Sequence, residues 1–271
     1  MINKQEIKVA KEMPKGYIRR VAPSVFSTKP SNEVSKHYTH IPTERVIDDM
    51  NLLGWDVIDA KEVKARKNST KGYQKHLLTF RNKDIVINGD DGDTVYPQIL
   101  LTNSHDGKNA FTFTAGLFRL ICENGLVIAD QKFNDFKMRH MGYGFEELQD
   151  MIKDMVEELP HTVESMNRMK AIELNQHQIL KFANEALECR FTKEERNRIH
   201  VDLDKLIIPV RKEDTGKDLW SVFTVLQEKM IEGDFEYHAG CKLRKAREIK
   251  NFKQDMKVNK VLFKFSLEYA V

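Results

Sequence analysis

The feature that most restricts the fold is a change in hydrophobic periodicity near residue 144. Before this point, apolar residues alternate with polar ones or form short runs between turns, as in the alternating segment 110–115. After it, they recur every three to four residues, as in Leu148, Ile152 and Met155. A run of strands followed by a run of helices is typical of an α+β fold. We therefore predict an antiparallel, β-rich N-terminal half with one preceding helix, followed by a mostly helical C-terminal half.

The same pattern divides the chain into three segments. Residues 1–42 contain four prolines and show little periodicity, so we expect an extended N-terminal arm. Residues 43–143 are predicted to form one helix and the antiparallel sheet. Residues 144–271 are predicted to form a helical region that packs on this sheet, so that the whole chain is one continuous domain.

Turn and capping residues predict the limits of these elements. Thr43 is a suitable N-cap for a helix that ends at Gly54, and Asn124-Gly125 is a hairpin signal. Strands are expected at 55–65, 75–81, 84–88, 95–103 and 110–115. Helices are expected at 144–159, 161–189, 192–200, 219–233 and 257–269.

Charge is distributed unevenly along the chain. Residues 1–83 carry 17 Lys and Arg against 9 Asp and Glu, residues 84–240 carry 18 against 29, and residues 241–271 carry 9 against 3. Two basic ends indicate an anionic partner. Aromatic residues lie among the cations of 61–83, and aromatic rings can stack on unpaired bases while Lys and Arg bind phosphates. An ordinary solvated basic hairpin is the alternative that charge alone leaves open.

These observations predict a nucleic-acid-binding surface made of two basic segments. The residues predicted in the first segment are Arg66, Lys67, Lys71, Tyr73, Lys75 and Arg81. The residues predicted in the second segment are Lys242, Arg244, Lys245 and Arg247.

The sequence lacks the motifs that mark catalytic or cofactor sites. It contains no H-E-x-x-H, C-x-x-C, Walker loop or G-x-S-x-G. Asp59, Glu62 and Lys64 have the residue types of a metal-dependent nuclease, but they are spaced too closely for its active site. We therefore predict no catalytic residue, no metal and no cofactor, and we expect a protein that is not an enzyme.

The most unusual segment is Asn103-Ser104-His105-Asp106-Gly107, which lies between two predicted strands. Asn, Ser, Asp and Gly are turn formers, so one interpretation is a tight turn with His105 at its tip. The other is a polar tip that presents His105 and Asp106 to a ligand. Arg119, in a mostly apolar strand, is expected to pair with an acid or to face an anion.

At these residues the sequence resembles a phage- and plasmid-borne family catalogued as domain of unknown function 932. The family shows an N-S-H-D-G turn and then an R-L-x-C-x-N-G-L-V segment, and both are present, at 103–107 and 119–127. The second segment includes Arg119, Cys122, Asn124 and Gly125, with Glu123 in place of the usual serine. Residues 43–82 and 219–233 are similar to the same family. The resemblance implies a mobile-element origin, but it implies no activity.

Three function classes follow, and the sequence leaves them open. The first is a single-stranded DNA-binding protein that anneals strands during recombination, because the order helix, basic hairpin, strands, helix is similar to Rad52-type annealing proteins. Such a protein usually works as a ring or filament, so we expect a homo-oligomer. The second is an antagonist of a host defence or restriction system, whose acidic middle segment binds a basic host protein. The third is the metal-dependent nuclease.

Composition also predicts the compartment. No run of about 18 apolar residues occurs, and the N-terminus lacks the apolar segment of a signal peptide. The three cysteines are odd in number and far apart, which is typical of a reducing environment. We therefore predict no membrane association and a location in the cytoplasm, which is the host cytoplasm if a phage encodes the protein.

Overall fold

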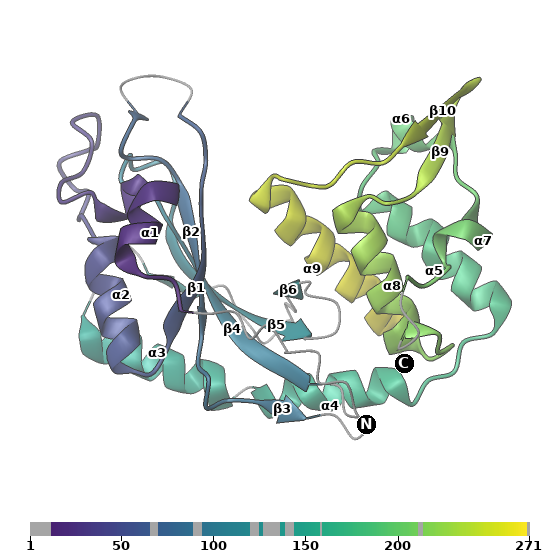
Figure 1. The fold of residues 1–271 in the computed structure, drawn as a ribbon, viewed down its shortest axis with the longest axis horizontal. Helices are drawn as coiled ribbons and strands as arrows, with labels where there is room; N and C mark the ends of the chain where they lie inside the picture. Colours follow the sequence, from purple (N-terminus) through teal and green to yellow (C-terminus); the bar gives the residue numbers. More distant parts are fainter. Residues whose placement is uncertain are drawn as a thin grey trace, which may run out of the picture. The chain divides into compact units, whose positions relative to one another are not determined.

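The computed structural model describes residues 12–65, 70–88, 94–119, 125–126, 136–138, 144–157, 159–210 and 214–269. The chain divides into two compact units (Figure 1). The first contains most of the larger sheet and the helices up to Glu157, and the second contains the helices from Leu159 onward with a smaller sheet. The first helix of the predicted helical half therefore belongs to the sheet unit. Packing of the helical region on this sheet stays a prediction.

The larger sheet is antiparallel, as predicted. Its main strands are β1 (Asp56–Glu62), β2 (His76–Arg81), β4 (Thr94–Asn103) and β5 (Phe111–Arg119), in the spatial order β1-β2-β4-β5. The short strands are β3 (Ile87–Asn88), β6 (Gly125–Leu126) and β7 (Phe136–Met138), of which β3 pairs with β4 and β7 with β5. All residues of β2 are buried, because this strand is paired on both edges.

Within residues 12–42, the described part of the predicted extended arm, the chain is not extended throughout. It contains helix α1 (Lys15–Val21) and the 3-10 helix η1 (Pro23–Phe26). Ile18, Val25 and Phe26 are buried in the first unit. Periodicity missed both helices because each has at most two turns and lies beside a proline.

Helix α2 (Thr43–Leu52) buries the apolar stripe that predicted it, and Gly54 follows with a φ of +80°. The predicted cap is wrong in one detail. Pro42 occupies the N-cap position, and Thr43 is the first helical residue. The Thr43 hydroxyl instead lies 2.8 Å from Nε2 of His76 in β2, so it joins the helix to the sheet.

The predicted long helix at 161–189 is two helices. After α3 (Phe145–Glu157), the chain forms α4 (Leu159–Lys170) and α5 (Gln176–Glu188). The break lies at Asn175, whose side chain accepts a hydrogen bond from the backbone N–H of Gln178, while the Gln178 side chain accepts one from the backbone N–H of Asn175. This reciprocal capping box begins a new helix, although the apolar spacing continues across it.

The second unit is built around α8 (Leu219–Glu232). Besides α4 and α5, its other elements are α6 (Lys193–Arg196), β8 (Ile199–His200), α7 (Leu203–Leu206), β9 (Glu236–Ala239), β10 (Lys242–Lys245) and α9 (Phe252–Glu268). Nearly all of α8 is buried, and its Phe223 packs edge-on against Phe263 of α9, with ring centroids 6.1 Å apart. Helix α8 also contacts α4 and α5, so it forms the centre of this unit.

Among the helices of the described segments, none combines the length and the apolar character that a membrane span requires.

Candidate nucleic-acid interface

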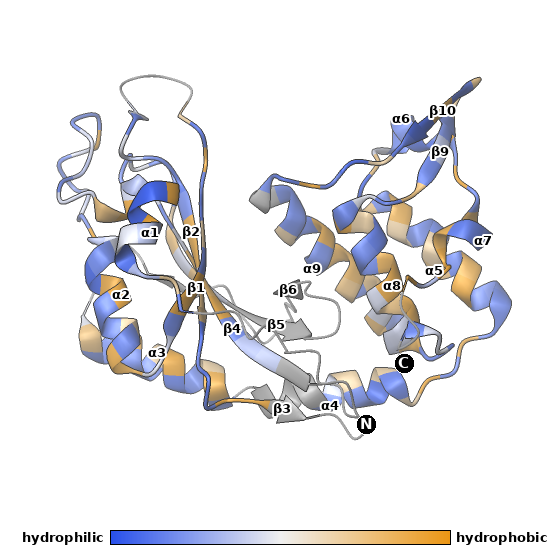
Figure 2. Ribbon diagram, in the orientation of Figure 1, coloured by the Kyte–Doolittle hydropathy of each residue, from blue (hydrophilic) through white to orange (hydrophobic). Residues whose placement is uncertain are grey.

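Strands β9 and β10 form an antiparallel hairpin that the sequence did not predict. Tyr237 pairs with Arg244 and Ala239 with Lys242, and β8 pairs with the other edge of β9. Gly240 makes the turn with a φ of +59°, which glycine adopts without strain. All four residues of β10 are exposed. Figure 2 shows the hairpin coloured mostly as hydrophilic, which agrees with the exposure of β10.

The hairpin is fixed to the end of α8 by backbone contacts. Ala246 donates its N–H to the carbonyl oxygen of Phe235 over 2.8 Å. Gly233 ends α8 with a φ of +91°, and a Cβ at this position would lie 2.6 Å from the backbone carbonyl carbon of Arg247. Gly233 therefore allows the chain after β10 to pack directly on the chain before β9.

This packing creates an open groove with a volume of about 760 Å³. Such a volume lies within the roughly 300–1,000 Å³ typical of ligand sites. The groove is lined by Arg190, Phe191, Tyr237, Arg244, Lys245, Ala246 and Arg247. Three of the four residues predicted in the second basic segment therefore line one concave surface. Lys242 lies exposed in the same strand but does not line the groove.

The arginines of the groove carry charge that carboxylates do not offset. Arg244 and Arg247 are exposed, and neither pairs with a carboxylate of the described residues. Arg190 follows α5, and its guanidinium donates to the carbonyl oxygens of Met230 and Arg247. Burial lowers the pKa of Arg190, since its charge loses solvation there. An anion in the groove would compensate this charge.

Lys245 differs from the arginines because it is paired. Its Nζ lies 2.6 Å from Oδ1 of Asp234, and both side chains are largely exposed. The hydrogen bond and the charge of Lys245 lower the pKa of Asp234, and the same pair raises the pKa of Lys245. Asp234 therefore competes with any phosphate for this ammonium group.

Aromatic rings form a second part of the groove. The rings of Phe191 and Tyr237 have centroids 5.4 Å apart and planes 64° apart, and both residues are partly exposed. Phe235 lies beneath them, 6.4 Å from Phe191 and 6.5 Å from Tyr237, and is buried. The guanidinium of Arg190 lies 5.7 Å from the Phe235 ring. Rings held in this way beside cations can stack on unpaired bases.

The first basic segment lies in the other unit and is less suited to phosphate binding. Lys71 is exposed, and Tyr73 and Lys75 are partly buried. Arg81, a predicted phosphate contact, is only 4% exposed and lies 4.8 Å from the Tyr96 ring. That prediction is therefore wrong for Arg81, because its position in the central strand β2 buries the guanidinium. Arg66 and Lys67 lie outside the described residues.

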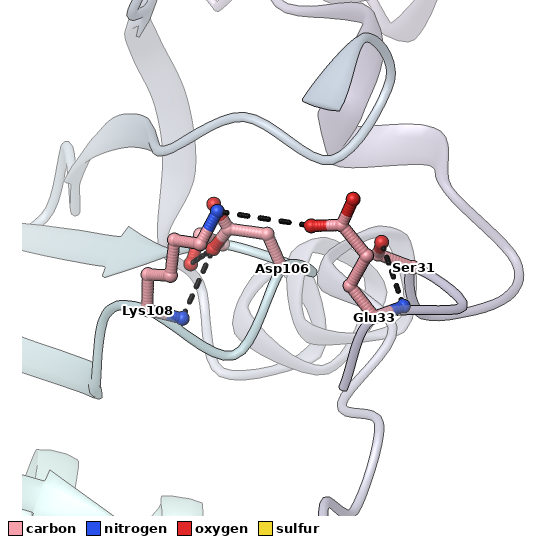
Figure 3. Close-up of polar contacts among 5 residues, drawn as sticks. Ser31, Glu33, Asp106 and Lys108 are labelled. Atoms are coloured by element: carbon pink, nitrogen blue, oxygen red, sulfur yellow. Dashed lines mark hydrogen bonds and ion pairs between the residues drawn. The ribbon is translucent and has the colours of Figure 1, made fainter. Parts of the chain in front are cut away.

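The N-S-H-D-G segment forms the expected turn but does not expose its histidine. Ser104 donates its hydroxyl to Oδ1 of Asp106 over 2.7 Å, and the same oxygen accepts the backbone N–H of Lys108. Lys108 also reaches Glu33 at 4.0 Å (Figure 3). His105 is 0% exposed, so the turn does not present this side chain to a ligand.

Backbone contacts explain why His105 is buried. Its carbonyl oxygen accepts the N–H of Ser31, and its own N–H donates to the carbonyl of Tyr73. The hydroxyl of Tyr38 donates to the carbonyl of Ser104 over 3.0 Å. Burial and the charge of Asp106 raise the pKa of Tyr38 to about 12. The turn thus holds the N-terminal segment against the end of the sheet.

Three histidine rings gather behind this turn. The ring centroid of His105 lies 4.6 Å from that of His40 and 5.2 Å from that of His76. Thr43 connects them, since its hydroxyl lies 2.8 Å from His76 and 3.0 Å from Nδ2 of Asn103. No group of three metal-ligating side chains suited to an ion occurs among the described residues. His76, His105, Thr43 and Asn103 are buried, and the hydrogen bonds of Thr43 join α2 to β2 and β4.

The burial of His76 predicts a stability that depends on pH. Burial lowers the pKa of His76 to about 4, whereas an unfolded histidine titrates near 6.5. Between pH 4 and pH 6.5, His76 is mostly protonated in the unfolded chain and mostly neutral in the folded chain, so unfolding takes up a proton at this residue. The free energy of unfolding should therefore fall by about 1.4 kcal/mol per pH unit as the pH drops from about 6.5 to about 4. Urea unfolding across this range measures the slope.

The matched variant is His76→Gln, which cannot gain the proton. It should have a shallower slope than the original protein in the same pH interval, whatever its absolute stability. Equal slopes in the two proteins would show that His76 is not the group responsible.

The remaining family positions are only partly described. Arg119 ends β5, and Gly125 begins β6. Cys122 and Asn124 lie outside the described residues, and nothing tests the predicted partner of Arg119. Gly107 has a φ of +70°, and a Cβ there would lie 3.3 Å from Val34, so glycine suits this turn.

Sequence reasoning missed four residues of the groove: Arg190, Phe191, Tyr237 and Ala246. Arg190 and Phe191 follow a helix and lie about fifty positions from the basic segment. Tyr237 alone had a sequence signal, because it is an aromatic residue just before the late cluster of cations. The contact between these segments is a property of the fold.

Comparison with known proteins gives a family but no activity. The model of a family described as "Domain of unknown function (DUF932)" matches residues 31–263. The chain is similar to two Escherichia coli (strain K12) proteins, "UPF0380 protein YafZ" and "UPF0380 protein YfjQ". It is 28% identical to the first and 27% to the second, over 90% of this chain and 86% of each relative. No solved structure matches the chain significantly. Because the family model covers most of its length, the chain belongs to the DUF932 family.

Proposed function

We propose that this protein binds single-stranded nucleic acid, with the groove between the end of α5 and the β9–β10 hairpin as its interface. The observation that carries the proposal is one concave surface on which exposed Arg244 and Arg247 lie beside the rings of Phe191 and Tyr237. Cations without carboxylate partners favour phosphates, and partly exposed rings favour unpaired bases. Strand annealing by a homo-oligomer is the specific activity that we assign to it.

In this mechanism the groove holds the strand without a chemical step. Arg244 and Arg247 bind phosphate oxygens through their planar guanidinium groups. Tyr237 and Phe191 stack on bases, which excludes a duplex because its bases are already stacked in pairs. Bases outside the groove stay accessible for pairing with a second strand.

The test is fluorescence anisotropy with labelled single-stranded and duplex oligonucleotides over a range of salt concentrations. With Arg244 and Arg247 in contact with phosphates, the logarithm of the association constant should fall with a slope of roughly −1.4 against the logarithm of salt concentration. Single strands should bind at least about tenfold more tightly than duplex. Binding that does not depend on salt would contradict the proposal.

Releasing Lys245 should strengthen binding. Asp234→Asn removes the carboxylate that holds the Lys245 ammonium at 2.6 Å, so we expect about three- to tenfold higher affinity for a single strand in low salt. Asp202→Asn is the matched control, since Asp202 is also exposed and pairs with a lysine, Lys205, outside the groove lining. Equal gains in the two variants would indicate a general charge effect and not a site.

The two other function classes stay predictions. For the antagonist, Glu146 and Glu147 lie exposed on α3, where a basic partner could reach them. For the nuclease, the carboxylates are already engaged: Asp59 lies 3.2 Å from Lys61, and Glu62 accepts the N–H of Ser24. Loss of DNA length in the presence of magnesium would identify a nuclease, which the binding proposal does not predict.

A further inference from the structure

The groove concentrates positive charge at one place instead of distributing it along a track. Arg190, Arg244 and Arg247 line the same cavity, and within the described residues none of them pairs with a carboxylate. A surface that binds the interior of a strand needs about one cation for each phosphodiester, spaced along the strand, because each phosphodiester carries a single charge. A phosphate monoester carries a charge of about −1.5 to −2 at pH 7 and three acceptor oxygens. The two exposed guanidinium groups of Arg244 and Arg247 therefore match the charge of one monoester better than that of one diester.

The aromatic side of the groove favours the same ligand. Phe191 and Tyr237 meet at 64°, so they present a ring face beside the arginines and not a continuous stack. A base at the end of a strand has one face that no other base covers. An interior base must first unstack from a neighbouring base before it can stack on a protein ring. Separating an interior base from its neighbours costs stacking energy. A terminal base therefore binds such a ring with less rearrangement.

From this geometry we propose that the groove recognises the phosphorylated end of a single strand, in which Arg244 and Arg247 bind the terminal phosphate monoester and Tyr237 stacks on the terminal base. Arg190 is a positioning residue, because its guanidinium donates to the backbone carbonyl of Arg247 and so fixes the chain that carries the phosphate-binding side chain. This inference rests on the proposed function and adds the part of the strand that is bound.

The experiment compares short oligonucleotides of one sequence that differ only at one end. They carry a 5′-phosphate or a 5′-hydroxyl with the label at the 3′ end, or a 3′-phosphate or a 3′-hydroxyl with the label at the 5′ end. We expect one of the two phosphorylated ends to bind about tenfold more tightly than its hydroxyl counterpart. The preference should disappear in Arg244→Gln/Arg247→Gln, and unlabelled circular single strands should compete poorly.

Each contrary result has a distinct meaning. If phosphorylated, unphosphorylated and circular strands bind equally and with the expected salt dependence, end recognition is wrong and the proposed function stands. If no oligonucleotide binds in low salt, both are wrong. If the end preference persists in the double variant, the groove is not the end-binding site. If a free nucleoside monophosphate competes as well as the phosphorylated strand, the ligand is a nucleotide and the strand end is not required.

Discussion

Arg244→Gln/Arg247→Gln should weaken single-strand binding by at least about 100-fold in low salt. Each arginine is expected to form charge-assisted hydrogen bonds to phosphate, which contribute about 1.5–3 kcal/mol each, and 1.4 kcal/mol is a factor of ten. Loss of two phosphate contacts should also make the salt slope shallower by about 1.4. Both side chains are exposed and make no ion pair among the described residues, so the fold should be retained. Anisotropy measures the affinity, and circular dichroism checks the fold.

The control removes the same charge from a different surface of the second unit. Lys181→Gln/Lys205→Gln changes two exposed lysines that do not line the groove. It should lower affinity only slightly, through the overall charge. A comparable loss in both double variants would mean that binding follows net charge and that the groove has no special role.

Gly233→Ala should destabilise the second unit by about 4 kcal/mol and abolish binding. A residue with a side chain is strained at a φ of +91°, at a cost of about 1–3 kcal/mol. In addition, the new Cβ would lie 2.6 Å from the backbone of Arg247 and 2.8 Å from that of Ala246, where no side-chain rotation can relieve the overlap. The chain after β10 must move, and the groove opens. Urea unfolding measures the stability, and anisotropy measures the binding.

Gly240→Ala is the control for the conformational part of this effect. Gly240 also has a positive φ, +59°, but a Cβ there would meet no atom within 4 Å. It should cost only about 1–2 kcal/mol and leave the groove intact. If the two glycine variants lose equal stability, the close packing at Gly233 does not hold the hairpin in place.

The sheet and the main helices could be predicted because their burial is periodic. Helix α3 buries Leu148, Ile152 and Met155 at the spacing that predicted it, and Phe111 and Phe113 of β5 are buried as their alternation indicated. The break before α5 could not be found in this way, since a capping box is a local hydrogen-bond pattern that leaves the apolar spacing unchanged.

Strands β9 and β10 were missed for a different reason. No residue of β10 is buried, and Leu243 is 55% exposed, so β10 lacks the apolar face that a half-buried strand shows. In β9, Tyr237 and Ala239 alternate with exposed residues, but this strand has only four residues. The hairpin is held by backbone pairing and by the hydrogen bond from the Ala246 N–H to the Phe235 carbonyl, and not by the burial of its side chains. A sequence pattern contains no record of such contacts.

The candidate site was predicted in part. Charge alone identified the segment that contains Arg244 and Arg247, because a cluster of cations is visible in the sequence itself. Arg190 lines the groove because its guanidinium donates hydrogen bonds to the carbonyl oxygens of Met230 and Arg247, which are distant from it in the sequence. The position of His105 was not predicted correctly. Its turn-forming neighbours indicated that it lies at the tip of a turn, but its side chain is buried. Burial came from the N-terminal segment, whose Ser31 and His40 contact the turn.

The N-S-H-D-G segment and the groove therefore have different roles. Asn103, Ser104 and His105 are buried in the first unit and bind its N-terminal segment to the sheet, which is a structural role. The groove lies in the second unit and supplies the exposed cations and rings that a nucleic acid needs. Variants of the turn should therefore act on stability, and variants of the groove on affinity.

The most direct test of the interface is photo-crosslinking of a single strand that carries a halogenated pyrimidine, followed by mass spectrometry of the modified peptides. We expect crosslinks at Phe191 or Tyr237, which line the groove, and their loss in Arg244→Gln/Arg247→Gln. Crosslinks confined to residues 61–83, with none in the groove, would contradict this expectation and place the interface on the first unit.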